Sequence, residues 1–147
     1  MTEYARVAAV YLLRADGAAL LQHRDDKPDI PHPNIWVPPG GHAEPGELMD
    51  ACARREFLEE TSYVLGDLHL LTEFLDDHAQ GFAPLQLSMY WSLYDGAQCP
   101  VCHEGQALEF TPRARAAEIE IPQYLVDCWD QAIEVASLKR HLSSVGD

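Results

Sequence analysis

Residues 47–61 contain neither glycine nor proline, and Leu, Met, Ala, Arg and Glu dominate them. This composition predicts a helix of about four turns. Five residues before it, the segment 36–41 reads Trp-Val-Pro-Pro-Gly-Gly, which cannot form a helix because proline and glycine interrupt one. The chain must therefore pass from an extended segment through a tight turn into a helix, which favours folds that mix strands and helices along the chain.

Extended segments are expected on both sides of this helix. Residues 5–14 are rich in Val, Leu and Tyr and predict a buried strand, and a turn at Ala15-Asp16-Gly17 leads to a hairpin partner over 18–24. Three prolines make 25–34 a loop. Further strands are expected over 35–37, 68–75, 85–94 and 106–110, with a polar loop containing Gly81 and Pro84, a loop over 95–103 and a second helix over 124–138. This order predicts an α/β (α+β) fold, with a mixed sheet between helices.

The chain carries 10 Lys and Arg against 24 Asp and Glu, a formal net charge of −14. This excess argues against nucleic acid or an anionic membrane as a partner, and allows a phosphorylated substrate only if metal cations bridge the two. The length of 147 residues predicts one domain over 1–147. No basic region followed by an apolar stretch opens the chain, and the apolar run 7–13 is far shorter than the roughly 20 residues that span a bilayer. A cytoplasmic protein with reduced cysteines is expected.

Three glutamates gather on one face of the predicted helix. Glu56, Glu59 and Glu60 fall within roughly 100° of arc, while Ala51 and Leu58 are expected to point toward a core. A solvated acidic face is the simplest interpretation of such a cluster. The glycine turn in front of the helix, which exposes main-chain groups, and a neighbouring arginine that can orient a carboxylate favour instead a site for a hard divalent cation and polyphosphate.

The spacing of these residues resembles the Nudix box. Gly41 is followed after five residues by Glu47, and after seven more by Arg55-Glu56-Phe57-Leu-Glu59-Glu60-Thr-Ser62-Tyr63. Every fixed position of the family pattern is matched except the last glycine, where Ser62 stands. The chain is therefore similar to the Nudix hydrolases, whose general layout would cover nearly all of it.

The resemblance implies hydrolysis of a nucleoside diphosphate linked to another group, with Mg²⁺ or Mn²⁺ as cofactor. Carried over by position, Glu56 and Glu60 would be metal ligands, Glu59 a ligand or the base that activates water, and the Gly40 carbonyl another ligand. Arg55 and Glu47 would pair to orient loop and helix. The family glycine ends the helix, so Ser62 is expected at positive φ, at a cost of about 1 kcal/mol.

Further candidates lie outside the box. The resemblance implies that one more glutamate reaches the metal from a late loop, and Glu104 is the candidate for ligand or base. Its rivals are Glu73, Asp76 and Asp77. For substrate binding the candidates are Trp36, by stacking on a base or sugar, Arg24, by contact with phosphate, and Gly41, through its main chain.

Several alternatives stay open at this point. The chain could be a Nudix-fold module that binds a nucleotide without cleaving it, or an isomerase of isoprenoid diphosphates on the related fold. Cys99, Cys102 and His103 have the spacing of a haem attachment site or half a zinc site, although two free thiols fit a cytoplasmic loop better. Small size favours a nucleoside triphosphate or a dinucleoside polyphosphate as substrate, and a homodimer is compatible with the sequence.

Overall fold

Strand β1 (Ala5–Leu13) is the centre of the fold, because its side chains supply both hydrophobic cores. Alternate residues of a strand point to opposite faces of the sheet. Ala8, Val10 and Leu12 enter one core, and Tyr11 and Leu13 enter the other. The uninterrupted apolar run in the sequence is thus a strand buried on both sides.

The computed structural model describes residues 4–77 and 83–145, and they form a mixed sheet. β1 runs parallel to β6 and antiparallel to β4, and the strand order is β3-β2-β1-β6-β5, with β7 paired to β2. The other strands are β2 (Ala19–His23), β3 (Trp36–Val37), β4 (Gly40–His42), β5 (His69–Asp76), β6 (Leu85–Leu93) and β7 (Ala107–Thr111). The predicted mixed sheet is confirmed. Gly81, in the expected polar loop, lies outside the described residues.

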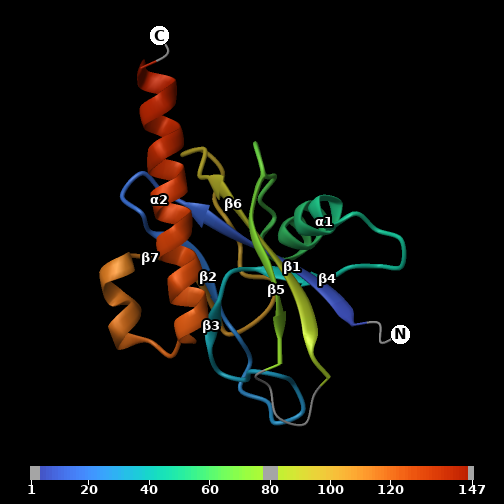
Figure 1. The fold of residues 1–147 in the computed structure, drawn as a ribbon. Coiled ribbons are helices and arrows are strands. Elements are labelled where there is room, and N and C mark those ends of the chain that lie inside the picture. Colours follow the sequence, from blue (N-terminus) through green and yellow to red (C-terminus); the bar gives the residue numbers. More distant parts are fainter. Residues whose placement is uncertain (1–3, 78–82, 146–147) are drawn as a thin grey trace.

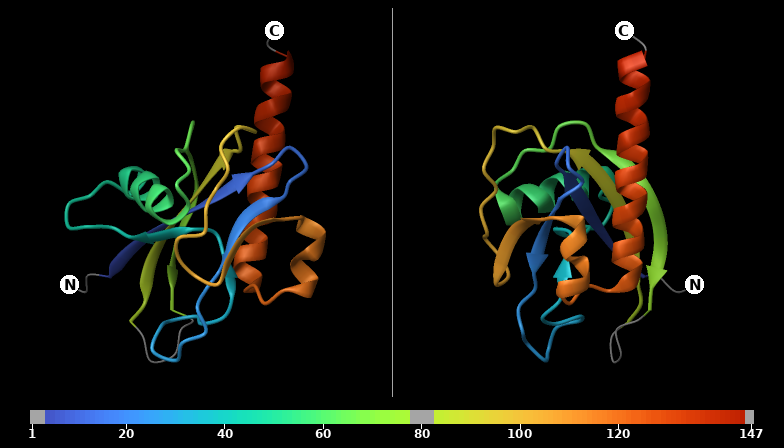
Figure 2. Two further views of the ribbon diagram at one scale, coloured as in Figure 1. Left: turned by 180° about the vertical axis from the view of Figure 1, so that it is seen from behind. Right: turned by 90° about the vertical axis from the view of Figure 1, so that its left-hand side faces the viewer.

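Two helices cover opposite faces of this sheet (Figures 1 and 2). Helix α1 (Met49–Thr61) packs on the face that carries Val10, and helix α2 (Gln123–Val145) packs on the face that carries Tyr11. Fully buried Trp129 of α2 donates its indole N–H to the Gly17 carbonyl at 3.0 Å, which ties the helix to the β1–β2 turn. The expected arrangement of a sheet between helices is therefore confirmed.

Two helical segments differ from the expectation. Helix α2 extends to Val145 instead of ending near 138, because residues 139–145 contain no glycine or proline to stop it. A short 3₁₀ helix, η1 (Arg113–Glu118), precedes it and was not predicted. Within 4–77 and 83–145, neither helix combines the length and apolar character that crossing a membrane requires.

The buried face of α1 is also not the expected one. Ala51 and Leu58 are exposed, Leu58 by 47%, so the prediction that they face the core is wrong. The side chains that pack on the sheet are those of Cys52, Ala53 and Phe57. Glu60 follows Phe57 on this face and is buried with it. The helix is therefore rotated so that one glutamate points into the protein.

Candidate active site

Strand β4 passes unusually close to its neighbours at its two glycines. A Cβ atom on Gly40 would lie 1.9 Å from the Ala8 carbonyl oxygen of β1. A Cβ atom on Gly41 would lie 2.2 Å from a carboxylate oxygen of Glu56. At Gly40 the contact is with main chain, so only glycine fits there, whereas a side chain at Gly41 would displace the Glu56 carboxylate from its place against the strand.

Glu60, one helical turn after Glu56, is buried where α1 packs against β4. It is 8% exposed, and its Oε2 accepts a hydrogen bond from the Gly40 N–H at 3.2 Å. Burial, together with the neighbouring Glu104 carboxyl, raises the pKa of Glu60 to about 9. The charged form of Glu60 is therefore destabilised by burial and by a neighbouring carboxyl group. A cation bound beside Glu60 would stabilise that charged form, so the environment favours cation binding.

Arg55 anchors the loop before α1 to the helix itself. Its Nε and Nη2 donate to the two carboxylate oxygens of Glu47, both at 2.8 Å, and its Nη1 donates to Glu56 at 2.9 Å. This two-point hydrogen bonding lowers the pKa of Glu47 to about 2. Nη2 also donates to the His42 carbonyl at 3.1 Å. The Arg55–Glu47 pair inferred from the resemblance is therefore formed, and it orients both the loop and Glu56.

Glu59 does not join the other two helix glutamates. Its side chain is 58% exposed, lies 3.4 Å from Arg55, and is not in the wall of the cavity that Glu56 and Glu60 line. Neighbouring helix positions point about 100° apart, so a helix that turns Glu60 inward turns Glu59 outward. Within the described part of the chain, no three His, Cys, Asp or Glu side chains converge where they could hold a metal ion.

Glu104 reaches the same cavity from a different element. Glu104 belongs to the loop 94–106 between β6 and β7, the Glu104 loop, which runs along the end of α1. There the Val101 N–H donates to the Thr61 carbonyl at 2.7 Å, and the His103 N–H donates to the Glu60 carbonyl at 3.2 Å. Glu104 lines the cavity beside Glu60. Of its rivals, Glu73 and Asp77 are not in the cavity wall, and Asp76 lies at the other end.

Ser62 ends α1 in the left-handed conformation, with φ 60° and ψ 15°, as expected for the glycine position of the box. Its N–H donates to the Leu58 carbonyl at 2.8 Å. Its hydroxyl forms a hydrogen bond with Nε2 of His103, a residue of the Glu104 loop. The serine therefore keeps the turn and adds a contact that glycine could not make.

The cavity between the sheet and these loops has a volume of about 380 Å³. One end holds Glu56, Glu60 and Glu104, and the walls beyond it are formed by Leu85, Leu87, Met89 and Leu125. The cavity thus combines an acidic end with an apolar chamber, as a ligand with an anionic part that binds cations and an apolar, planar part would require.

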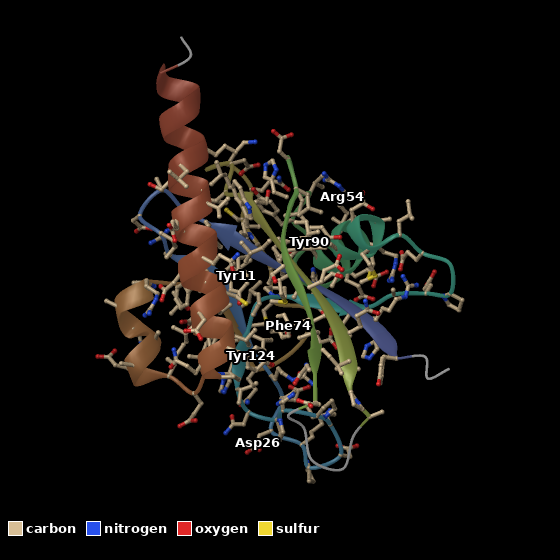
Figure 3. The ribbon with its side chains drawn as sticks, viewed as in Figure 1. Tyr11, Asp26, Arg54, Phe74, Tyr90 and Tyr124 are labelled. Carbon is tan, nitrogen blue, oxygen red and sulfur yellow. The ribbon has the colours of Figure 1, made fainter. Side chains whose placement is uncertain are left out.

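A polar cluster around Asp76 closes the far end of the chamber; the sequence named Asp76 only as a rival of Glu104 and did not connect it with His32 or Tyr124. Buried Asp76 interacts with His32 Nε2 at 3.1 Å and accepts a hydrogen bond from the Tyr124 hydroxyl at 3.3 Å. The Tyr124 ring packs edge-on against Phe74 at the base of α2 (Figure 3). These residues come from a proline-rich loop, a strand end and a helix start, so no local pattern in the sequence connects them.

The sequence-predicted substrate residues divide into two groups. Gly41 and Arg24 line the cavity, but the Arg24 guanidinium donates to the carbonyls of His32 at 3.0 Å and Pro31 at 2.9 Å and so holds the loop in place. Trp36 is not in the cavity wall and stacks on His23, with ring centroids 4.6 Å apart. Trp36 therefore packs on a residue of the neighbouring strand, and its stacking on a ligand stays a prediction.

The four cysteines do not come together in one place. All four are free thiols, with Cys52 and Cys128 buried in the two cores and Cys99 and Cys102 exposed on the Glu104 loop. Since Cys52 and Cys128 lie on opposite faces of the sheet, the four thiols cannot share a metal ion.

Comparison with known proteins also relates the chain to the Nudix family. The family model described as the NUDIX domain matches residues 3–123. The m7GpppN-mRNA hydrolase NUDT17 of Bos taurus is 44% identical over 57 residues, which are 39% of this chain and 18% of that protein. The putative 8-oxo-dGTP diphosphatase of Bacillus subtilis (strain 168) is 40% identical over 60 residues, which are 41% of this chain and 36% of that protein. The chain therefore aligns with well under half the length of these curated relatives.

Among solved structures, the NUDIX domain of Shewanella oneidensis NrtR, complexed with ADP ribose, superposes with a TM-score of 0.76 and covers 92% of this chain and 90% of that one. At 17% sequence identity this likeness concerns the fold alone. The family model, in contrast, spans most of the chain and includes the glycine turn, the Arg55–Glu47 pair and the two inward glutamates. The chain belongs to the Nudix family.

Proposed function

We propose that the protein hydrolyses a pyrophosphate bond in a nucleoside triphosphate or a dinucleoside polyphosphate, with Mg²⁺ or Mn²⁺ as cofactor. One observation carries the proposal: Glu56, Glu60 and Glu104 occupy one end of a cavity whose walls beyond them are largely apolar. A nucleoside polyphosphate has the matching division, with its anionic chain at one end and a planar base at the other.

The residues at the acidic end fit a divalent cation. Mg²⁺ in nucleotide sites is held by one or two carboxylates together with substrate phosphates and water, so three converging side chains are not required. Glu56 and Glu60 would hold it with the Gly40 carbonyl. When bound, the cation neutralises negative charge on the phosphate oxygens and makes bound water more acidic.

The chain's own groups have separate tasks in this reaction. A carboxylate must accept the proton of the water that attacks phosphorus. Glu104 is better placed for that task than Glu59, because it lines the cavity while Glu59 faces solvent. Arg55 fixes the Glu56 carboxylate. The apolar walls would exclude water from the nucleobase of the substrate.

The relatives support both proposed substrate classes. By their names, one of them hydrolyses m7GpppN-mRNA and another is a putative 8-oxo-dGTP diphosphatase. The second name contains a nucleoside triphosphate, and the first contains a capped mRNA in which a triphosphate joins two nucleosides. The second candidate function is a module that binds a nucleotide without cleavage, as the complex of the NrtR domain with ADP ribose suggests. The inward glutamates weigh against it, because a binding module gains nothing from a buried carboxyl.

A substrate panel tests the proposal. Nucleoside triphosphates, dinucleoside polyphosphates and ADP-ribose are incubated with Mg²⁺ or Mn²⁺, and released nucleotides are separated by chromatography. We expect nucleoside monophosphate from members of the first two classes, and turnover reduced by at least about 100-fold in Glu60→Gln, because even residues behind a metal ligand matter by 10- to 100-fold. Exposed Glu109 on β7, changed to Gln, is the matched control. Binding of a nucleotide without any product would support the second candidate instead.

A further inference from the structure

Gln22 is a polar residue in an otherwise apolar part of the sheet. It belongs to β2, whose sequence is Ala-Leu-Leu-Gln-His, and it is 5% exposed. Burying an amide costs free energy unless its hydrogen bonds are replaced. An apolar residue would serve the core at this position, so the amide calls for another explanation.

The Gln22 amide lies between the two carboxyl-bearing elements of the acidic end. Its Nε2 is 3.2 Å from the Glu104 carbonyl oxygen and 3.5 Å from Glu60 Oε2. Both partners are acceptors, which requires the NH₂ group and not the amide oxygen to face them. Gln22 thereby joins helix α1 to the loop that carries Glu104, across the end of the cavity that Gln22 itself lines.

The strand that carries Gln22 is held on both sides. In the register of the sheet, Gln22 is opposite Val37 of β3 and Leu108 of β7. A strand bonded along both edges changes position little, so the amide is a fixed reference point for groups on α1 and on the loop.

The Glu104 loop is fitted closely to this strand. Gly105 has φ +84°, and a Cβ atom there would lie 2.6 Å from the His23 carbonyl oxygen. The next residue, Gln106, donates its N–H to the same carbonyl at 2.7 Å. The Glu104 loop is therefore held by the end of α1 on one side and by β2 on the other. Between these two sets of contacts, the Gln22 amide donates to the Glu104 carbonyl.

We propose that Gln22 is a positioning residue of the acidic end, whose buried amide sets the orientation of the Glu60 carboxylate and the distance of Glu104 from it. The inference rests on the proposed function, since it concerns the groups that would hold the cation and accept the proton. Gln22 does not touch the substrate in this scheme. It acts only through Glu60 and Glu104.

The test is a titration of the substrate-free protein with Mn²⁺, in which free Mn²⁺ is measured by electron paramagnetic resonance. Gln22→Met keeps the length of the side chain and removes the donor. We expect about 10- to 100-fold weaker Mn²⁺ binding, the usual effect of losing a residue that orients a metal ligand. Gln22→Asn keeps the amide on a shorter stem and should bind Mn²⁺ with intermediate affinity.

Gln106→Met is the matched control. The Gln106 amide also donates to a main-chain carbonyl, that of Arg24 at 2.7 Å, and to Asn34 at 3.1 Å, but it is outside the cavity wall. We expect this variant to bind Mn²⁺ like the wild type. In turnover assays Gln22→Met should need a higher Mn²⁺ concentration for half-maximal rate, while KM for the nucleotide at saturating Mn²⁺ stays close to that of the wild type.

Three results would overturn the proposal: unchanged Mn²⁺ binding in Gln22→Met, an equal loss in Gln106→Met, or failure of both Gln22 variants to fold, which would assign the amide to stability. Thermal unfolding followed by circular dichroism separates the last case from the others. If the wild type neither binds Mn²⁺ nor cleaves any nucleotide, the proposed function itself fails. If the wild type does both and Gln22→Met behaves identically, only the role of Gln22 is refuted.

Discussion

The three glutamates that follow Arg55 have different surroundings, although they look equivalent in the sequence. Glu60 is buried, Glu56 is held by Arg55, and Glu59 is in solvent. An exposed ion pair such as Arg55–Glu59 contributes at most about 1 kcal/mol. Position in the helix, and not charge alone, therefore decides which carboxylate can act in the cavity.

We predict an order of effects on turnover from this difference. Glu56→Gln and Glu60→Gln remove carboxylates from the cavity and should each reduce kcat by at least about 100-fold. Glu59→Gln should reduce it by roughly fivefold or less, since 1 kcal/mol corresponds to about that factor in rate. The measurement is kcat for each variant at saturating Mg²⁺ and substrate. Equal inactivation of Glu59→Gln and Glu60→Gln would show that Glu59 turns into the cavity when the site is loaded.

For single residues, the sequence predicts which residues belong to the candidate site better than it predicts where their side chains point. The resemblance to the Nudix box implied the pairing of Arg55 with Glu47 and the positive φ at Ser62, and the structure contains both. The stacking of Trp36 on His23 depends on which strand lies beside it, and such a contact between separate elements leaves no trace in local spacing.

Helix α1 illustrates why element boundaries were predictable and the buried face was not. Its start and end follow from composition, and the structure places them within two residues of the expectation. Its inward face carries Cys52, Ala53 and Phe57 but also Glu60, while Leu58 faces solvent. A helix that places a carboxyl group in the interior departs from the apolar pattern that marks a buried face, so the pattern does not predict the inward position of Glu60.

Helices η1 and α2 are joined by an ion pair that gives a testable dependence on pH. Arg113 donates through Nε and Nη2 to the two Asp130 carboxylate oxygens at 2.6 and 3.0 Å, and its guanidinium lies over the Trp129 ring. Hydrogen bonding to Arg113 lowers the pKa of Asp130 from its ordinary value of 3.8. A carboxyl whose pKa is lower in the folded state stabilises that state above its ordinary pKa, and this stabilisation is lost as the pH falls below it.

We therefore expect Asp130→Asn to lower the melting temperature at pH 7, and we expect this effect to shrink steadily as the pH is lowered below 3.8 and the wild-type carboxyl takes up its proton. Because the pair is half exposed, the shift should be small but measurable by calorimetry. Glu134→Gln, the same loss of charge at an exposed position of the same helix, is the control. A difference between wild type and Asp130→Asn that persists unchanged at low pH would mean that packing, and not charge, makes the contribution.

For the whole molecule, the layered arrangement could be predicted because it follows from patterns that repeat over many residues. The apolar run of β1 requires cover on both faces, and two helix-forming segments are available to supply it. The cavity could not be predicted in the same way. Its walls come from strands, loops and the start of α2, and their meeting depends on how all of these elements pack together.

The net charge of −14 makes a further prediction about the substrate. A protein of that charge repels a nucleoside triphosphate at long range, and salt weakens such repulsion, with a screening length of about 10 Å at 0.1 M. We expect KM to fall and kcat to stay constant as NaCl is raised from about 20 to about 200 mM, a range over which this screening changes strongly. Mg²⁺ is kept saturating throughout, so that salt does not act by displacing it. The basic side chain of Arg24 lines the cavity and attracts anions locally, so a KM that rises with salt would show that this local field outweighs the charge of the whole molecule.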